Sequence, residues 1–134
     1  MRYLDTGNRN PDDALGHWLG IVLAEDVREL RWQTGYFALE GIGLLLATLE
    51  RLRVSEGLLH VVVGSNDGAT LADDVSALMA KSGIPRVNAQ LGVVSYGRGL
   101  YHPKTYHVTR SDGTVAAYVG SANLTSPGVS GLNV

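Results

Sequence analysis

The sequence predicts an α/β fold, a three-layer α/β/α sandwich with a mixed β-sheet at its centre. Helical and extended patterns alternate along the chain to about residue 94, which is the order found in sheets that helices cover. The stretch LLHVVVG at 58–64 is a short apolar strand of the kind that is buried on both faces. Two extended runs near the C-terminal end are separated by a short turn, and they add an antiparallel pair to the sheet.

Length and composition predict one globular domain over residues 1–134. Hydrophobic residues make up 45% of the chain and charged residues 18%, as in folded soluble proteins. The chain has no cysteine, which excludes disulfides and thiolate metal sites. The longest apolar run, GIGLLLA at 41–47, is too short to cross a bilayer. We therefore expect a cytoplasmic protein that does not bind membranes.

The sequence pattern in the first half of the chain predicts two helices and a strand between them. Apolar residues at helical spacing predict a helix over about 12–30, and a second set predicts a helix over about 40–53. Between them, QTGYFAL at 33–39 has aromatic residues behind a glycine and predicts a strand.

The second half continues the alternation. After the strand at 58–64, the loop GSNDGAT follows a strand as phosphate-binding loops do, but it lacks the Gly-Lys-Ser/Thr element. We interpret it as an ordinary connection. A helix is expected to begin at Thr70, whose hydroxyl can cap it, and to end near Gly83. Residues 87–94 supply the next strand.

The extended runs at about 100–109 and 114–120 flank RSDG and predict a β-hairpin. A two-residue turn would set His102 opposite Asn123 and Lys104 opposite Ser121, because opposed residues pair in register. A four-residue loop would set His102 opposite Ser121. Both registers bring the same four side chains together, whereas a three-residue loop would turn Ser121 and Asn123 to the other face.

These four side chains suit a phosphoryl group. Lys104 would neutralise charge, and Ser121 and Asn123 would donate hydrogen bonds. His102 can attack phosphorus or transfer a proton near neutral pH. The sequence offers no carboxylate cluster or His/Cys set for a metal, so we expect neither a metal nor a cofactor.

Charge is distributed unevenly along the chain. Residues 1–74 hold six basic and twelve acidic side chains, whereas residues 75–134 hold five basic side chains and one acidic side chain. A basic C-terminal half favours contact with a polyanion, although a scatter of solvated charges is the alternative. In YGRGLYHPK, Arg98 lies between two glycines just ahead of His102. We expect this loop to contact nucleic-acid phosphate, the alternative being a simple surface loop.

The run HPK followed by GSAN resembles the His-x-Lys and Gly-Ser-x-Asn signature of the phospholipase D superfamily. The fuller wordings HPKTY and GSANLT are most similar to its nuclease branch, which includes restriction endonucleases and helicase-associated nucleases. The signature covers 102–125. The earlier stretches TGYFALEGIGLLLATLERL and LLHVVVGSND resemble the first strand, helix and strand of the family more loosely.

The resemblance implies a phospholipase D-like fold and a metal-independent nuclease that hydrolyses DNA phosphodiesters, with RNA left open as a substrate. Family members with one motif per chain form homodimers through the active-site face. His102 of one protomer would attack phosphorus, and His102 of the partner subunit would protonate the leaving oxygen. Lys104 and Asn123 would bind the non-bridging oxygens, with Ser121 in support, and Arg98 would join the substrate-binding surface.

In the family's longer pattern, an aspartate follows the lysine by five residues. The corresponding residue in this chain is Thr109, so the chain departs from the pattern there. Nuclease members that lack this aspartate use a glutamate shortly after the Asn segment, which here would fall just past Val134. We therefore expect the domain to be truncated at its C-terminal end. Two alternatives stay open. One is a phosphodiesterase or transferase of lipid headgroups, although the sequence has no Lys/Arg-rich amphipathic helix; the other is a non-catalytic nucleic-acid-binding or dimerisation module.

Overall fold

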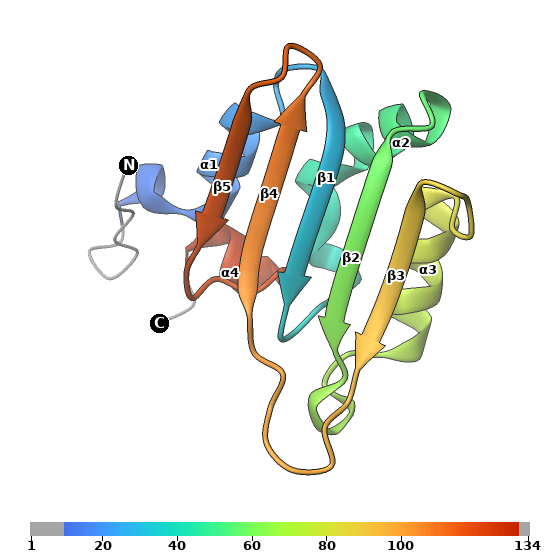
Figure 1. Ribbon diagram of the computed structural model, residues 1–134. Coiled ribbons are helices and arrows are strands. Elements are labelled where there is room, and N and C mark those ends of the chain that lie inside the picture. The colour runs from blue at the N-terminus through green and yellow to red at the C-terminus, as the bar shows by residue number, and fades with distance from the viewer. Residues whose placement is uncertain (1–9, 132–134) are drawn as a thin grey trace.

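A computed structural model describes residues 10–131 of the chain. Within this range the strands are β1 (Val27–Thr34), β2 (Leu58–Gly64), β3 (Ala89–Val94), β4 (Lys104–Arg110) and β5 (Val115–Val119). They form one five-stranded sheet in the order β3-β2-β1-β4-β5 (Figure 1). The first three strands are parallel, and β4 and β5 are antiparallel to their neighbours. The predicted α/β class and mixed sheet are confirmed.

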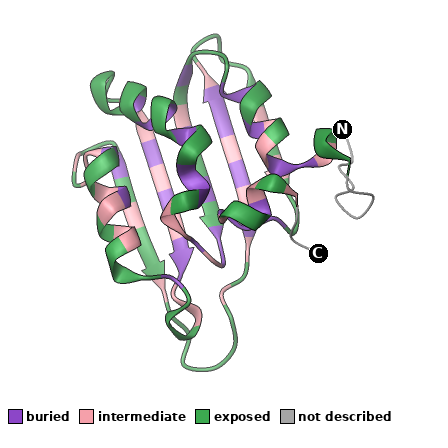
Figure 2. Ribbon diagram, turned by 180° about the vertical axis from the view of Figure 1, so that it is seen from behind, coloured by how far each residue is buried: buried purple, intermediate pink, exposed green. Residues whose placement is uncertain are grey.

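The described α-helices are α1 (Leu15–Val22), α2 (Leu46–Val54), α3 (Ala72–Ser82) and α4 (Ser126–Ser130). They all lie behind the sheet in Figure 1 and in front of it in Figure 2, so they cover a single face. The prediction of three layers is therefore wrong for residues 10–131, which form two. No helix in this range is long and apolar enough to cross a membrane.

Alternation along the strands explains the single helical layer. In β1, Trp32 and Thr34 are buried whereas Arg31 and Gln33 are exposed, so this strand has only one face suited to a core. Even in β2, which we expected to be buried on both faces, His60 is only half-buried. The largest fully buried side chains include Trp32, Tyr106, Phe37, Leu15, Leu19, Leu30, Leu59 and Leu78. The core lies between the sheet and the helices, as the buried segments in Figure 2 show.

The region predicted as one helix over 12–30 contains two elements. The helix α1 ends at Val22, and β1 begins at Val27. The buried residues Leu30, Trp32 and Thr34 recur with a period of two, which is a strand pattern. A register shift between Val27 and Glu29 interrupts this period at its start. The strand predicted over 33–39 consequently overlaps β1 by only two residues.

The middle of the chain follows the predictions more closely. The strand at 58–64 is confirmed as β2, and the helix at 40–53 is confirmed as a 3₁₀ segment (Leu39–Leu45) that runs into α2. The helix α3 ends at Ser82 and is capped by Gly83 with a left-handed backbone, so the predicted end near Gly83 is confirmed. Thr70 does not cap α3. Its hydroxyl accepts a hydrogen bond from the main-chain N–H of Phe37 at 3.3 Å, which ties the start of α3 to the segment after β1.

The predicted hairpin forms with a register that differs from both favoured ones. Thr109 pairs with Val115, and the Arg110 N–H donates to the Thr114 carbonyl at 2.9 Å. The loop therefore has three residues, 111–113, and Gly113 has a φ of 87°. A type I turn followed by a left-handed glycine is a common hairpin loop. This odd-numbered loop places Gly120 opposite Lys104, with the Gly120 N–H donating to the Lys104 carbonyl at 3.1 Å.

Candidate functional site

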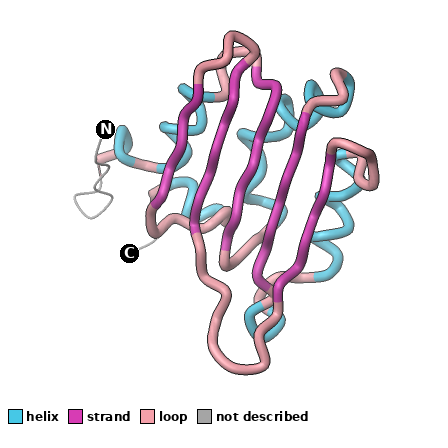
Figure 3. The backbone as a smooth tube through the Cα atoms, in the orientation of Figure 1, coloured by secondary structure: helices cyan, strands magenta, loops and turns pink. Residues whose placement is uncertain are grey.

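The candidate site lies where β1 ends and β4 begins. The connection from β3 to β4 extends beyond the ends of the strands and returns to the sheet beside β1 (Figures 1 and 3). This point also separates the parallel strands from the antiparallel pair. Ligands of α/β sheets commonly bind outside the carboxyl ends of strands where the strand order changes direction.

His102 and Lys104 are in direct contact. The Lys104 Nζ lies 2.7 Å from Nδ1 and 2.8 Å from Nε2 of the His102 ring, and it donates to the His102 carbonyl at 3.2 Å. Lys104 pairs with Thr34 in the sheet and is only 7% exposed, whereas His102 is exposed. The buried lysine stem thus brings its ammonium group to the exposed imidazole.

The surroundings of His102 favour its neutral form. Burial lowers the pKa of the imidazole, and the Lys104 charge lowers it further. Although the residue is exposed overall, the Tyr36 ring covers one side of the imidazole edge-on, with centroids 5.3 Å apart. Burial also lowers the pKa of Lys104. Because an ammonium group only donates, a ring nitrogen that accepts from it has no hydrogen. A neutral imidazole is the nucleophilic form.

Asn123 reaches the same region from the segment after β5. Its Oδ1 accepts a hydrogen bond from the Tyr36 N–H at 3.2 Å. Since a main-chain N–H can only donate, this contact fixes which end of the carboxamide is the oxygen. Asn123 is only 8% exposed, and its NH₂ group makes no hydrogen bond with residues 10–131.

Asn123 lies near Tyr36 for a reason other than the expected pairing of two strands. The three-residue hairpin loop would have turned it away if the ladder had continued, but β5 ends at Val119. The chain then crosses the sheet end, where Leu124 forms a parallel bridge with Phe37. The Ala38 N–H donates to the Leu124 carbonyl at 3.1 Å. This crossing brings Asn123 to Tyr36, whose ring contacts His102.

Ser121 and Arg98 lie apart from this group. Ser121 is exposed, and no hydrogen bond joins it to the side chains of His102 or Lys104 in the described part of the chain. Its separation follows from the loop length, because an odd-numbered loop removes it from the register with Lys104. Arg98 is exposed, as are all residues of 95–100, and these residues belong to the projecting connection in Figure 3.

Two residues that sequence reasoning missed organise the site. The Thr34 hydroxyl, which is fully buried, donates to the Tyr36 carbonyl at 2.7 Å and accepts from the Leu124 N–H at 3.2 Å. Tyr36 contacts His102 with its ring and Asn123 with its N–H. Both lie in the stretch that we predicted as a continuous strand, and no local pattern distinguishes them.

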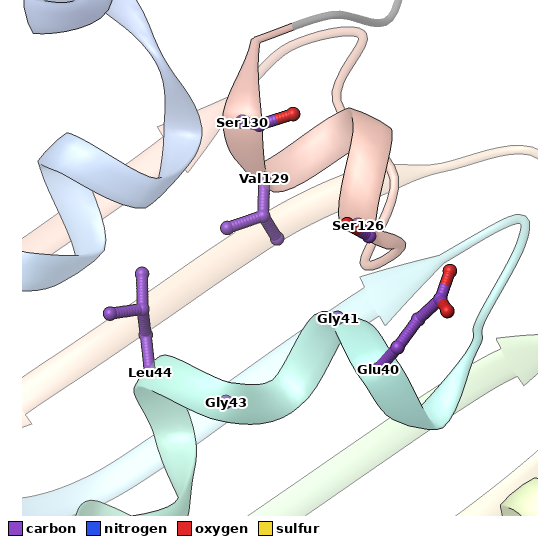
Figure 4. Close-up of a pocket in the computed structure, with 7 residues that line it drawn as sticks. All are labelled: Glu40, Gly41, Gly43, Leu44, Ser126, Val129 and Ser130. Atoms are coloured by element: carbon purple, nitrogen blue, oxygen red, sulfur yellow. The ribbon is translucent and has the colours of Figure 1, made fainter.

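A separate shallow groove lies between the 3₁₀ segment Leu39–Leu45 and α4, and Figure 4 shows its lining. Leu44 and Val129 point toward one another across it, and Glu40 supplies its one ionisable side chain. A groove whose lining has a carboxylate and no cation is unsuited to a phosphoryl group. Among residues 10–131, no three His, Asp or Glu side chains are grouped as metal ligands.

The candidate site formed by His102, Lys104 and Asn123 is described from the geometry of this chain, without a related protein for comparison. A comparison of the chain with models of protein families finds no match, and a comparison with curated proteins also finds none.

Proposed function

We propose that the chain is a phosphodiesterase of the phospholipase D type, a nuclease that hydrolyses DNA through a phosphohistidine in a homodimeric site without a metal ion. The contact that supports this most directly is the one between the Lys104 ammonium and the His102 ring, at 2.7 Å and 2.8 Å. It joins a nucleophile and a phosphate-binding cation at the end of the sheet. A role in restriction, or beside a helicase, is the context that the motif wording favours.

The reaction would proceed in two displacements. A neutral His102 nitrogen forms a bond to phosphorus as the bond to the leaving oxygen breaks, and that oxygen takes a proton from His102 of the partner subunit. A water molecule then gives a proton back to the same imidazole and attacks phosphorus, which breaks the phosphorus–nitrogen bond. Lys104 and the free NH₂ group of Asn123 would stabilise the charge on the non-bridging oxygens.

Substrate would replace one contact seen in the free protein. Lys104 now donates to the imidazole, so a bound phosphate would have to attract the ammonium to its own oxygens before His102 attacks. Phosphate is the stronger acceptor because the hydrogen bond is charge-assisted on both sides. The exposure of His102 suits a site that a second protomer completes across a two-fold axis.

DNA cleavage in excess EDTA tests the proposal. Wild-type protein should cleave in chelator, and His102→Ala should lose activity by about 10³-fold or more, as nucleophile variants do. His107→Ala is a matched control, since His107 lies on β4 five residues after His102 but outside this cluster, opposite Arg31. Full activity of His102→Ala, or equal losses in both variants, would refute the proposed role of His102.

Trapping the intermediate separates the proposal from its rivals. Acid-labile, base-stable label from ³²P-DNA should remain on wild-type protein and be absent from His102→Ala. DNA binding without any turnover would instead favour a non-catalytic module. Release of a headgroup from liposomes, with no cleavage of DNA, would favour a lipid phosphodiesterase.

A further inference from the structure

We propose that Asn66 is a positioning residue that fixes the main chain immediately before His102 and thereby sets the place of the imidazole. Asn66 follows β2, in the short 3₁₀ segment Asn66–Gly68. The sequence pattern of its loop, GSNDGAT, indicates only an ordinary connection. The consequence for catalysis rests on the function proposed above, whereas the consequence for His102 itself does not.

The Asn66 carboxamide joins two segments that are distant in sequence. Its Nδ2 donates to the Gly35 carbonyl at 2.5 Å and to the Tyr101 carbonyl at 2.9 Å. Its Oδ1 accepts from the Tyr101 N–H at 3.2 Å. One side chain therefore satisfies both main-chain groups of Tyr101, as a neighbouring strand would.

Tyr101 has no other main-chain support. β4 begins only at Lys104, and within residues 10–131 no hydrogen bond between main-chain groups involves 95–103. All residues of 95–100 are exposed. Asn66 thus holds the main chain of the long connection against the sheet one residue before His102, and the Tyr101 hydroxyl adds a longer hydrogen bond to the Gln33 side chain at 3.4 Å.

Close packing makes this point sensitive to displacement. A Cβ on Gly35 would lie 2.5 Å from Cδ2 of His102 and 3.0 Å from the Tyr101 carbonyl oxygen. A Cβ on Gly64 would lie 2.8 Å from Nδ2 of Asn66 and 2.9 Å from the same carbonyl oxygen. The ends of β1 and β2 therefore approach the His102 segment at distances that only glycine permits.

Asn66 has a left-handed backbone, with φ 33°, and so has Asp67, with φ 57°. Asparagine adopts this region more readily than most residues, and glycine adopts it freely. Asn66→Gly therefore removes the carboxamide without straining the loop, and Asn66→Ala is a second variant that keeps a Cβ. Asn88→Gly is the matched control, because the Asn88 Nδ2 also donates to a main-chain carbonyl, that of Glu56 at 2.8 Å, at the amino end of β3.

NMR on histidine-labelled protein tests the proposal without reference to activity. In folded Asn66→Gly and Asn66→Ala, exchange of the Tyr101 amide should accelerate at least tenfold. The His102 ring resonances should shift, and its pKa should rise toward the ordinary value of about 6.5. The resonances of His60 should stay in place, and Asn88→Gly should leave both His102 and Tyr101 unchanged. Wild-type exchange and titration in folded Asn66 variants, or equal changes at every histidine, would overturn the proposal.

Cleavage assays distinguish failure of this inference from failure of the proposed function. If the wild type cleaves DNA, Asn66→Gly should lower kcat at least tenfold and change KM less than threefold, because the carboxamide holds the segment before the nucleophile and both of its N–H donors are already used. Unchanged kcat would overturn the positioning role. If the wild type does not cleave DNA, the proposed nuclease fails, and the NMR outcomes still decide whether Asn66 positions His102.

Discussion

Tyr36 and Thr34 connect the parts of the candidate site at the level of single residues. Tyr36 presents its ring to His102 and its N–H to Asn123, so one residue contacts both the imidazole and the carboxamide of the candidate site. Thr34 holds the Tyr36 carbonyl and the Leu124 N–H. The side chains proposed to face a substrate are thereby supported by neighbouring groups, which is how precise sites are usually built.

Replacing Thr34 with valine should test whether its hydroxyl stabilises the segments that carry Tyr36 and Leu124. Valine keeps the shape but removes the partner of the buried Leu124 N–H and of the part-buried Tyr36 carbonyl, which costs roughly 1–3 kcal/mol. Urea unfolding of Thr34→Val should show this loss. Thr105→Val, on the neighbouring strand, replaces a half-buried threonine and should change the free energy of unfolding by less than about 0.5 kcal/mol. Equal effects would contradict the role of Thr34.

The pKa of His102 makes a prediction about pH. Burial and then the Lys104 charge lower it, so the imidazole should titrate below about 6.5 in NMR. A base whose pKa is lowered on folding binds protons more readily when unfolded, so stability falls as pH drops below about 6.5 and is unaffected well above it. If the proposed reaction requires neutral His102, the rise of the rate with pH should have its midpoint below about 6.5.

The two causes of the lowered pKa can be separated with one variant. Lys104→Met removes the charge and keeps most of the bulk, so the pKa of His102 should rise but stay below about 6.5. A His102 pKa above 6.5 in the wild type would contradict the described environment. A His102 pKa that falls in Lys104→Met would also contradict the described environment.

At the level of elements, local patterns predicted some of the fold and missed the rest for identifiable reasons. The apolar run at 58–64 became β2 because a short buried run between turn residues suits few other structures. In contrast, Asp112 and Gly113 predicted a turn but not its length, since two-residue and three-residue loops use the same residue types. The approach of Asn123 to Tyr36 depends on the bridge between Leu124 and Phe37, a distant contact that no local pattern encodes.

The hairpin loop itself is testable through its glycine. Gly113 has a φ of 87°, and an alanine in this region costs about 1–2 kcal/mol. Gly113→Ala should therefore lower the free energy of unfolding by that amount. Gly20→Ala is the matched change in α1, where a Cβ would meet nothing within 4 Å, and it should stabilise the protein by about 0.5–1 kcal/mol. The same sign for both would contradict the described loop.

The connection between β3 and β4 carries a prediction about nucleic acid. Arg98 is exposed within 95–100, and a phosphate contact by this residue would release about one counterion. Arg98→Ala should weaken DNA binding uniformly across sequences and reduce the slope of log K against log salt by about 1. Lys81→Ala, in the last turn of α3, should leave the slope unchanged. Fluorescence anisotropy at several salt concentrations would measure both.

At the level of the whole molecule, the site is half of the proposed catalytic centre. One chain supplies one His102, whereas the proposed reaction needs an attacking imidazole and a protonating one in different protonation states. Such a pair titrates together, and the rate should show a bell-shaped dependence on pH. A single protomer has one His102 and cannot supply both the attacking and the protonating imidazole.

Activity should therefore depend on protein concentration. Specific activity per chain should fall on dilution in parallel with the fraction of dimer measured by sedimentation. His102→Ala added in excess should suppress wild-type activity, because mixed dimers would lack one imidazole. Constant specific activity at concentrations where the protein sediments as a monomer would contradict the shared site.

The uncovered face of the sheet has a practical consequence. The chain contains no cysteine, and Ala117 is exposed on β5, opposite His107. Ala117→Cys would introduce a single thiol, and a nitroxide attached to it would project into solvent instead of into the packed interior. The separation of two such spin labels would then report how a pair of protomers is oriented in solution, with no crystal required.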